Sequence, residues 1–218
     1  MMTEQDFNIW EGVYENWDLA PADDDVFASD IWVDKISRQA LKIFESYHSP
    51  DELPLNTSIH ENALPLASAM LSLNGLEPLR VLDFGGGMGT GYLYLKTSLC
   101  AQKLIEYHIV EGEAICQRGK ERFSSHPNLY FHQTLPSLPD PVHIIHLGSS
   151  LQYIENWNGL IGSFTSLKPR YLILTDVLAG DIKNFVTIQK FHGKKIRTHF
   201  KNLKEFLSAV EQLGFHLI

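Results

Sequence analysis

The feature that most constrains this chain is a glycine-rich segment that directly follows a short apolar run. Val81-Leu82 leads into Asp83, and glycine then occupies four of the five positions of Gly85–Gly89. Glycine has no Cβ, so it tolerates positive φ angles and lets a ligand approach the backbone. A strand, a glycine-rich turn and a helix, in that order, build the nucleotide pocket of many α/β folds.

The spacing of the glycines separates two kinds of nucleotide loop. The dinucleotide fingerprint is G-x-G-x-x-G. The pattern cannot start at Gly85, Gly87 or Gly89, since its last position would then fall on Thr90, Tyr92 or Tyr94. The segment Gly85–Gly89 instead fits G-x-G-x-G and follows Asp83 by two residues. This spacing disfavours a nicotinamide-dependent dehydrogenase.

Length and composition indicate an ordinary globular protein. With 218 residues, the chain is long enough for one α/β domain with a sizeable core and an attachment. Hydrophobic residues make up 44% and charged residues 20% of the sequence. The net charge of −8 argues against a nucleic-acid partner, which would need a basic surface. It leaves a small phosphorylated or sugar substrate open.

The cysteines and the N-terminus bear on the cellular compartment. Cys100 and Cys116 form no C-x-x-C pair, so the sequence indicates neither a metal site nor a thioredoxin-like motif. The first residues lack the charged and apolar regions of a signal peptide. No run approaches the ~18 apolar residues of a membrane span. We therefore expect a cytoplasmic protein with reduced thiols and no membrane span.

The sequence divides into two regions. Residues 1 to 76 contain no pattern typical of a strand and predict an N-terminal helical extension that acts as a cap or lid. Residues 77 to 218 alternate apolar runs with helical patterns, which is typical of a parallel sheet with crossover helices. The expected strands are residues 79–84, 107–110, 129–132, 142–147 and 171–175, and the expected helices are residues 91–100, 113–124, 158–167 and 202–213.

Four aromatic residues near the N-terminus have the spacing of one helix face. Phe7, Trp10, Tyr14 and Trp17 follow one another at steps of three, four and three residues. Such a stripe either packs the core of the N-terminal helices or covers a ligand as a lid, with Tyr14 as the lid residue. Two more helices are expected, over residues 30–47 and 62–73.

The second strand supplies an acidic residue beside the glycine segment. Glu111 ends this strand, 28 residues after Asp83. Adjacent parallel strands end at the same edge of a sheet, so Glu111 should lie next to the glycine loop. An acidic residue in this position accepts hydrogen bonds from both hydroxyls of a ribose. We therefore expect a ligand with a free 2′-hydroxyl, because Glu111 would repel a 2′-phosphate.

Together these residues resemble a known family. The segment Val81–Thr90, followed by Val110-Glu111, is similar to motif I and the ribose-binding acid of class I S-adenosylmethionine-dependent methyltransferases. The resemblance covers about residues 79 to 218. It implies an α/β, Rossmann-like fold: a mostly parallel twisted sheet with helices on both faces. It also implies S-adenosyl-L-methionine as the cofactor.

A narrower resemblance extends to other segments. The chain is similar to a bacterial group of predicted methyltransferases found with genes for surface polysaccharide assembly, of O-antigen or capsule. The acceptors of that group are poorly defined. The segments that carry this similarity are Trp10–Trp17, the Asp83 loop, Ser149–Ile154 and Leu174–Asp176.

The resemblance implies roles for individual residues. Asp83 and the glycines would hold the amino and carboxylate ends of the methionine part, and Glu111 the ribose. Leu135 would lie near the adenine, and the two serines after strand four at the mouth where the methyl group is transferred. The implied cofactor-binding residues are Asp83, Gly85, Gly86, Gly87, Gly89, Glu111, Leu135, Ser149, Ser150 and the lid residue Tyr14.

The chain departs from the family pattern in two places. Many relatives contact adenine through an acidic or amide residue after strand three, where this chain has Gln133-Thr134. The sheet of the family also ends in an antiparallel hairpin. Here residues 185 to 200 could form a hairpin about His192-Gly193, and a further strand could begin at residues 215–218. Either this hairpin closes the sheet, or the sheet lacks its usual last strand.

Methyl transfer to a hydroxyl needs orientation and a base that removes a proton. The candidate catalytic residues are His146 and Asp176 at strand ends, and His192 and His199 are weaker candidates. Each also has a structural interpretation. His146 could be a hydrogen-bonded core histidine, and the other two histidines could lie on a solvated hairpin. Ser149-Ser150 could simply form a turn.

The sequence thus predicts an S-adenosylmethionine-dependent methyltransferase of a small molecule. The expected acceptor is a sugar or nucleotide-sugar, O-methylated in surface polysaccharide biosynthesis. Methylation of a nitrogen or carbon atom of another metabolite is an alternative, although no N-P-P-Y-like motif is present. A non-catalytic, methyltransferase-like binding module is a second alternative.

Overall fold

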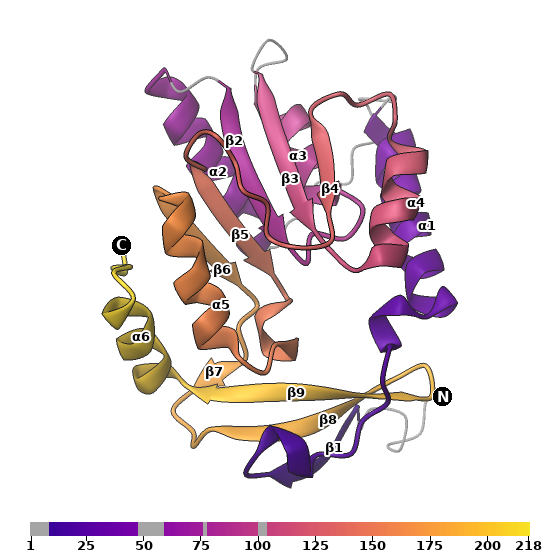
Figure 1. Cartoon of the computed structure of the whole chain (residues 1–218), viewed down its shortest axis with the longest axis vertical. Coiled ribbons are helices and arrows are strands. Elements are labelled where there is room, and N and C mark those ends of the chain that lie inside the picture. Colours follow the sequence, from indigo (N-terminus) through magenta and orange to yellow (C-terminus); the bar gives the residue numbers. More distant parts are fainter. Residues whose placement is uncertain (1–8, 48–58, 76–77, 100–103) are drawn as a thin grey trace.

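The computed structural model describes residues 9–47, 59–75, 78–99 and 104–218. Phe7 and Cys100, which were singled out in the sequence, lie outside these residues. The centre of the fold is a five-stranded parallel sheet (Figure 1). Its strands, in spatial order, are β4 (Leu129–His132), β3 (Ile105–Val110), β2 (Leu79–Phe84), β5 (Ile144–Gly148) and β6 (Tyr171–Thr175).

The central strands are buried on both faces, so they read as short, nearly continuous apolar runs. In β2, Val81 packs into the core on one face of the sheet and Leu82 into the core on the other. This confirms the α/β fold with helices on both faces. One face is covered by α1 (Asp30–Tyr47), α2 (Ile59–Leu73), α3 (Thr90–Ser98) and α4 (Glu113–Arg122), and the other by α5 (Trp157–Phe164) and α6 (Leu203–Gln212).

The helices begin close to the residues that the sequence indicates. The Asn202 side chain accepts a hydrogen bond of 3.0 Å from the backbone N–H of Glu205 and so caps α6. Asn156 caps α5 through the N–H of Gly159 in the same way. Such caps satisfy N–H groups that have no partner within the helix.

The prediction of a helix through Trp10 and Tyr14 is wrong. Residues Trp10–Tyr14 form strand β1, which pairs antiparallel with β8 (Phe185–Phe191). The side chain of Trp10 packs edge-on against the ring of Phe200, with centroids 5.1 Å apart. Contacts with a distant part of the chain therefore override the local helical spacing.

The hairpin forms, but it does not close the parallel sheet. β8 and β9 (Lys194–Asn202) join β1 and the two-residue strand β7 (Ala179–Gly180) in a separate sheet of order β1-β8-β9-β7. In Figure 1 this second sheet lies beyond the carboxyl ends of the central strands. The strand predicted at 215–218 is absent, since Leu217 and Ile218 project into solvent without a partner strand.

Candidate functional site

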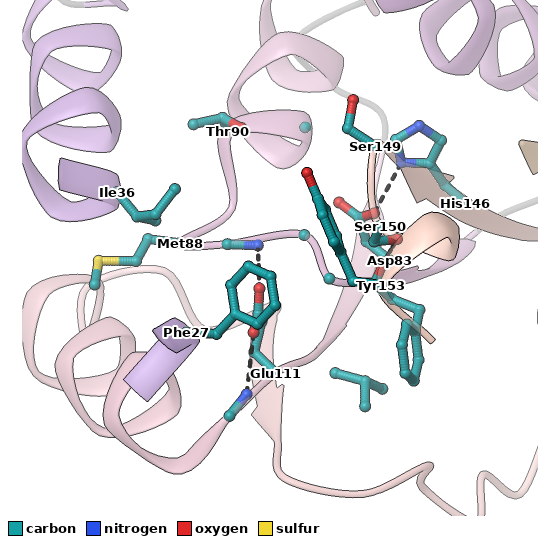
Figure 2. Close-up of a pocket in the computed structure, with 18 of the residues that line it drawn as sticks. Phe27, Ile36, Asp83, Met88, Thr90, Glu111, His146, Ser149, Ser150 and Tyr153 are labelled. Atoms are coloured by element: carbon teal, nitrogen blue, oxygen red, sulfur yellow. Dashed lines mark hydrogen bonds and ion pairs between the residues drawn. The ribbon is translucent and has the colours of Figure 1, made fainter. Parts of the chain in front are cut away.

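The carboxyl ends of β2, β3, β5 and β6 open onto a cavity of about 750 Å³. Strand β2 pairs with β3 on one side and with β5 on the other, so the order of the strands reverses its direction at β2. Such a switch point is where open α/β sheets bind ligands, and the volume is typical of small-molecule sites. Figure 2 shows the glycine loop crossing this cavity, with Glu111 and His146 on different strands around it.

The three motif glycines have the backbone that the sequence predicts. Gly85, Gly87 and Gly89 have φ angles of 74°, 57° and 86°. Their N–H groups serve the loop itself: that of Gly85 donates to the carbonyl of Val110 at 2.9 Å, and that of Gly87 to Glu111 Oε1 at 3.1 Å. These hydrogen bonds hold the loop against β3, so the two N–H groups point at β3 and not at a ligand.

Gly86, within the loop, and Gly91, just after the loop, have a packing role. A Cβ on Gly86 would overlap the Asp83 carboxylate, and one on Gly91 would overlap the Tyr107 hydroxyl. The chain can pass this close to the buried Tyr107–Asp83 pair only without side chains at these positions.

The Asp83 side chain has partners within the protein that the sequence did not indicate. Asp83 is only 2% exposed. Its Oδ2 accepts a hydrogen bond of 2.6 Å from the Tyr107 hydroxyl, and its Oδ1 lies 2.8 Å from Nδ1 of His146. Both oxygens are thus bound by protein groups. The buried carboxylate also lines the cavity, and its contact with the methionine part stays a prediction.

Glu111 lies where the sequence places it, at the end of β3 and on the cavity wall. Its Oε1 accepts from the Gly87 N–H and its Oε2 from the Gly112 N–H, at 3.0 Å. Burial raises the pKa of Glu111, although these two hydrogen bonds oppose the shift. Each carboxylate oxygen keeps further lone pairs for hydroxyl donors.

Several aromatic side chains line the cavity, and Tyr14 is not one of them. Phe27, just before α1, and Tyr153, after β5, line the cavity with ring centroids 5.2 Å apart. Tyr153 also donates a hydrogen bond of 2.7 Å to Gln189 Oε1 on β8. Tyr14 instead packs against Val186 in a small core of the second sheet. The prediction that Tyr14 covers the ligand site is therefore wrong, because Tyr14 does not line the cavity.

The residues after β5 and β6 meet at the cavity. Ser149 and Asp176 both have left-handed backbones, with φ angles of 54° and 56°, and Ser149 Oγ donates to Asp176 Oδ2 at 2.6 Å. Non-glycine residues in this conformation are strained and gather at functional sites. Ser150 Oγ donates to the Phe84 carbonyl at 2.9 Å, which ties the β5 end to the glycine loop. Leu135 also lines the cavity.

Of the candidate histidines, only His146 lines the cavity. Its side chain is 14% exposed. Burial lowers the pKa of His146, but the carboxylates of Asp83 and Asp176 outweigh burial and leave that pKa above its ordinary value. The ring of His199 lies tilted against that of Trp17, with centroids 4.7 Å apart, and burial lowers the pKa of His199 to about 4. His192 is exposed in the turn between β8 and β9.

The sequence did not single out Tyr107, Phe27 or Tyr153. Tyr107 is completely buried within a strand, where a tyrosine is usual. A buried tyrosine hydroxyl needs a hydrogen-bond partner. This need is the signal that could have drawn attention to Tyr107. Among the described residues, no three His, Cys, Asp or Glu side chains gather as metal ligands. The helices in the described ranges are also too short or too polar to span a membrane.

Solved structures resemble this fold at low sequence identity. DesVI from Streptomyces venezuelae has a TM-score of 0.52 at 13% identity, covering 82% of this chain and 91% of that chain. A predicted S-adenosylmethionine-dependent methyltransferase from Listeria monocytogenes has a TM-score of 0.51 at 12% identity, covering 71% of this chain and 82% of that chain. No protein-family model and no curated protein sequence matches the chain. The chain therefore has the Rossmann-like fold of class I S-adenosylmethionine-dependent methyltransferases.

Proposed function

We propose that this protein binds S-adenosylmethionine at the strand ends and transfers the methyl group to a small molecule. The observation that carries the proposal is Glu111, a half-buried carboxylate beside the glycine loop on the wall of a cavity of about 750 Å³. The amides of Gly87 and Gly112 hold this carboxylate in place, so its remaining lone pairs can receive the two ribose hydroxyls.

The other parts of the cofactor have matching surroundings. Leu135 supplies an apolar surface for the adenine. Thr90 and Gly91, at the start of α3, line the cavity, and the positive end of a helix favours a carboxylate. The rings of Phe27 and Tyr153 favour a sulfonium cation over water. When bound, the cofactor supplies an electrophilic methyl group.

The acceptor side of the proposal rests on His146, Asp176 and Ser149. The hydroxyl and carboxylate of the Ser149–Asp176 pair can hydrogen-bond an acceptor that carries several hydroxyls, and His146 can remove the proton from the one that is methylated. We therefore propose a sugar or nucleotide-sugar as the acceptor. The sequence resemblance adds O-methylation in surface polysaccharide assembly as the specific role.

Transfer of labelled methyl groups tests this assignment. The full chain is incubated with methyl-labelled S-adenosylmethionine and a panel of nucleotide-sugars and lipid-linked glycans. We expect label in a sugar product, and a His146→Gln variant should transfer it about 10²- to 10⁴-fold more slowly. Cofactor binding with no transfer to any hydroxyl, amine or carbon acceptor would instead support the non-catalytic binding module.

Asp176 also favours a second candidate acceptor, an amine. Its carboxylate is exposed at the cavity and can attract a protonated amine, which His146 would deprotonate before transfer. The position of the label in the product separates N-methylation from O-methylation. An aminosugar panel beside the neutral sugars makes this comparison direct.

Phe27 should distinguish the charged cofactor from its neutral product. A Phe27→Leu variant is expected to weaken S-adenosylmethionine binding by about 2- to 5-fold more than S-adenosylhomocysteine binding, since an exposed cation–π contact contributes roughly 0.5–1 kcal/mol. Calorimetry with both ligands measures this ratio. The control is Tyr14→Leu, which should lower stability while leaving both affinities unchanged. An equal loss for the two ligands in the Phe27 variant would exclude the aromatic contact with the sulfonium.

A further inference from the structure

Three polar side chains form a hydrogen-bonded chain across three neighbouring strands. The Tyr107 hydroxyl on β3 donates to Asp83 Oδ2 on β2 at 2.6 Å, and Asp83 Oδ1 lies 2.8 Å from Nδ1 of His146 on β5. We propose that Tyr107 and Asp83 are positioning residues that fix His146 as a general base, with its Nε2 free toward the acceptor. This inference rests on the proposed methyl transfer and deepens it.

Strand register brings these side chains to one face of the sheet. Asp83 is the direct neighbour of His146 between β2 and β5. Tyr107 is the neighbour of Val81, two residues before Asp83, so its side chain points to the same face. A tyrosine is long enough to reach a diagonal neighbour. The chain Tyr107–Asp83–His146 therefore follows from the parallel pairing of three strands.

Glycines pack around every member of this chain. A Cβ on Gly86 would overlap the Asp83 carboxylate, and one on Gly91 would overlap the Tyr107 hydroxyl. At the other end, a Cβ on Gly148 would lie 3.0 Å from Cε1 of His146. The three side chains therefore have little room to turn away from one another. A site that orients a catalytic group needs this kind of close support.

The charges determine that Tyr107 stays protonated and that His146 is the group that accepts a proton. Burial raises the pKa of Tyr107 well above its usual value, and the Asp83 charge raises it further, so the phenol keeps its proton and donates a hydrogen bond to Asp83. The charged groups that act on His146 are Asp83 on β2 and Asp176 after β6. Both favour its protonated form, so its conjugate acid is stabilised when a proton arrives.

The arrangement defines the proton's path. Neutral His146 donates its Nδ1–H to Asp83, which leaves the lone pair on Nε2. Figure 2 shows that this second ring nitrogen points away from Asp83. As the acceptor oxygen forms its bond to the methyl carbon and the sulfur–methyl bond breaks, the hydroxyl proton passes to Nε2. Asp83 then pairs with the imidazolium, and Tyr107 keeps its own proton throughout.

Nitrogen NMR of ¹⁵N-histidine-labelled protein tests this role without a known acceptor. The signal that is missing from a His146→Gln sample assigns the residue. At high pH we expect the Nδ1–H tautomer, and on titration a midpoint above that of an ordinary histidine. Asp83→Asn should lower the midpoint relative to the wild type, because Asp176 is then the one remaining carboxylate that opposes the effect of burial. An Nε2–H tautomer, or a midpoint that Asp83→Asn leaves unchanged, would overturn the inference.

Tyr107→Phe tests the far end of the chain and does not depend on the Asp83 variant folding. Without the hydrogen bond from the phenol, the Asp83 carboxylate stabilises the imidazolium more strongly, so the titration midpoint of His146 should rise. Tyr130→Phe, a partly exposed tyrosine on β4, is the matched control and should leave the midpoint unchanged. An unchanged midpoint in Tyr107→Phe would show that Tyr107 does not act on His146 through Asp83.

Two further measurements separate this inference from the proposed function. S-adenosylhomocysteine affinity should be the same in the wild type and in Tyr107→Phe. If neither binds, the proposed function fails even though the NMR result still stands. With an acceptor in hand, the transfer rate should rise with pH through the His146 midpoint of each variant. A pH profile that is the same in both variants would show that His146 is not the base.

Discussion

Replacing Glu111 by alanine is expected to weaken S-adenosylmethionine binding by about 10²- to 10⁴-fold. A hydrogen bond to a charged group contributes roughly 1.5–3 kcal/mol, and Glu111 is assigned to both ribose hydroxyls. The substitution also removes the acceptor for the Gly87 N–H, which helps to hold the glycine loop. Calorimetric titration of the folded variant measures the loss.

Two further variants show whether the loss of affinity is due to the Glu111 carboxylate. Glu113→Ala, two residues later and exposed at the start of α4, should bind the cofactor as the wild type does. Glu111→Gln should give an intermediate affinity, since an amide keeps one acceptor oxygen but loses the charge. If Glu111→Ala binds with unchanged affinity, the ribose is held elsewhere and the assignment of the cavity is wrong.

Gly86→Ala is expected to lower the free energy of unfolding by about 1–3 kcal/mol, the usual cost of overpacking. Its Cβ would overlap the Asp83 carboxylate, which cannot move without losing its bonds to Tyr107 and His146. For a chain of this size, each kcal/mol corresponds to about 2–4 °C in melting temperature. Chemical denaturation gives the free energy directly.

Two comparisons identify the source of this loss. Gly180→Ala, whose Cβ would meet nothing within 4 Å, should leave stability nearly unchanged. In an Asp83→Ala background the penalty of Gly86→Ala should become smaller, because the carboxylate is gone and only the Cβ of residue 83, at 2.9 Å, remains in the way. A double-mutant cycle measures this coupling. A full penalty in that background would mean that backbone strain, rather than the carboxylate, requires glycine here.

Much of the α/β architecture follows from local sequence. The central strands are short apolar runs because parallel strands are buried on both faces. Gly85–Gly89 and Glu111 could be placed together because parallel strands end at the same edge of the sheet. Ser149 and Asp176 meet at the cavity for the same reason.

The remaining features depend on partners that are distant in sequence. Trp10 pairs with Gln189, and no local pattern announces that pairing. Tyr107 meets Asp83 only because the register of β2 and β3 sets Val81 opposite it. The motif marks Asp83 as important, but whether its carboxylate faces a ligand or the protein depends on that register.

Calorimetric titration of the full chain with S-adenosylhomocysteine tests the central claim most directly, because this product resembles the cofactor and does not require the acceptor. The account predicts saturable binding to one site, with an accompanying rise in melting temperature. Binding should be lost in Glu111→Ala and kept in Glu113→Ala. No heat of binding to folded protein at about 1 mM ligand, where even a free energy of −4.1 kcal/mol would half-saturate the site, would contradict it.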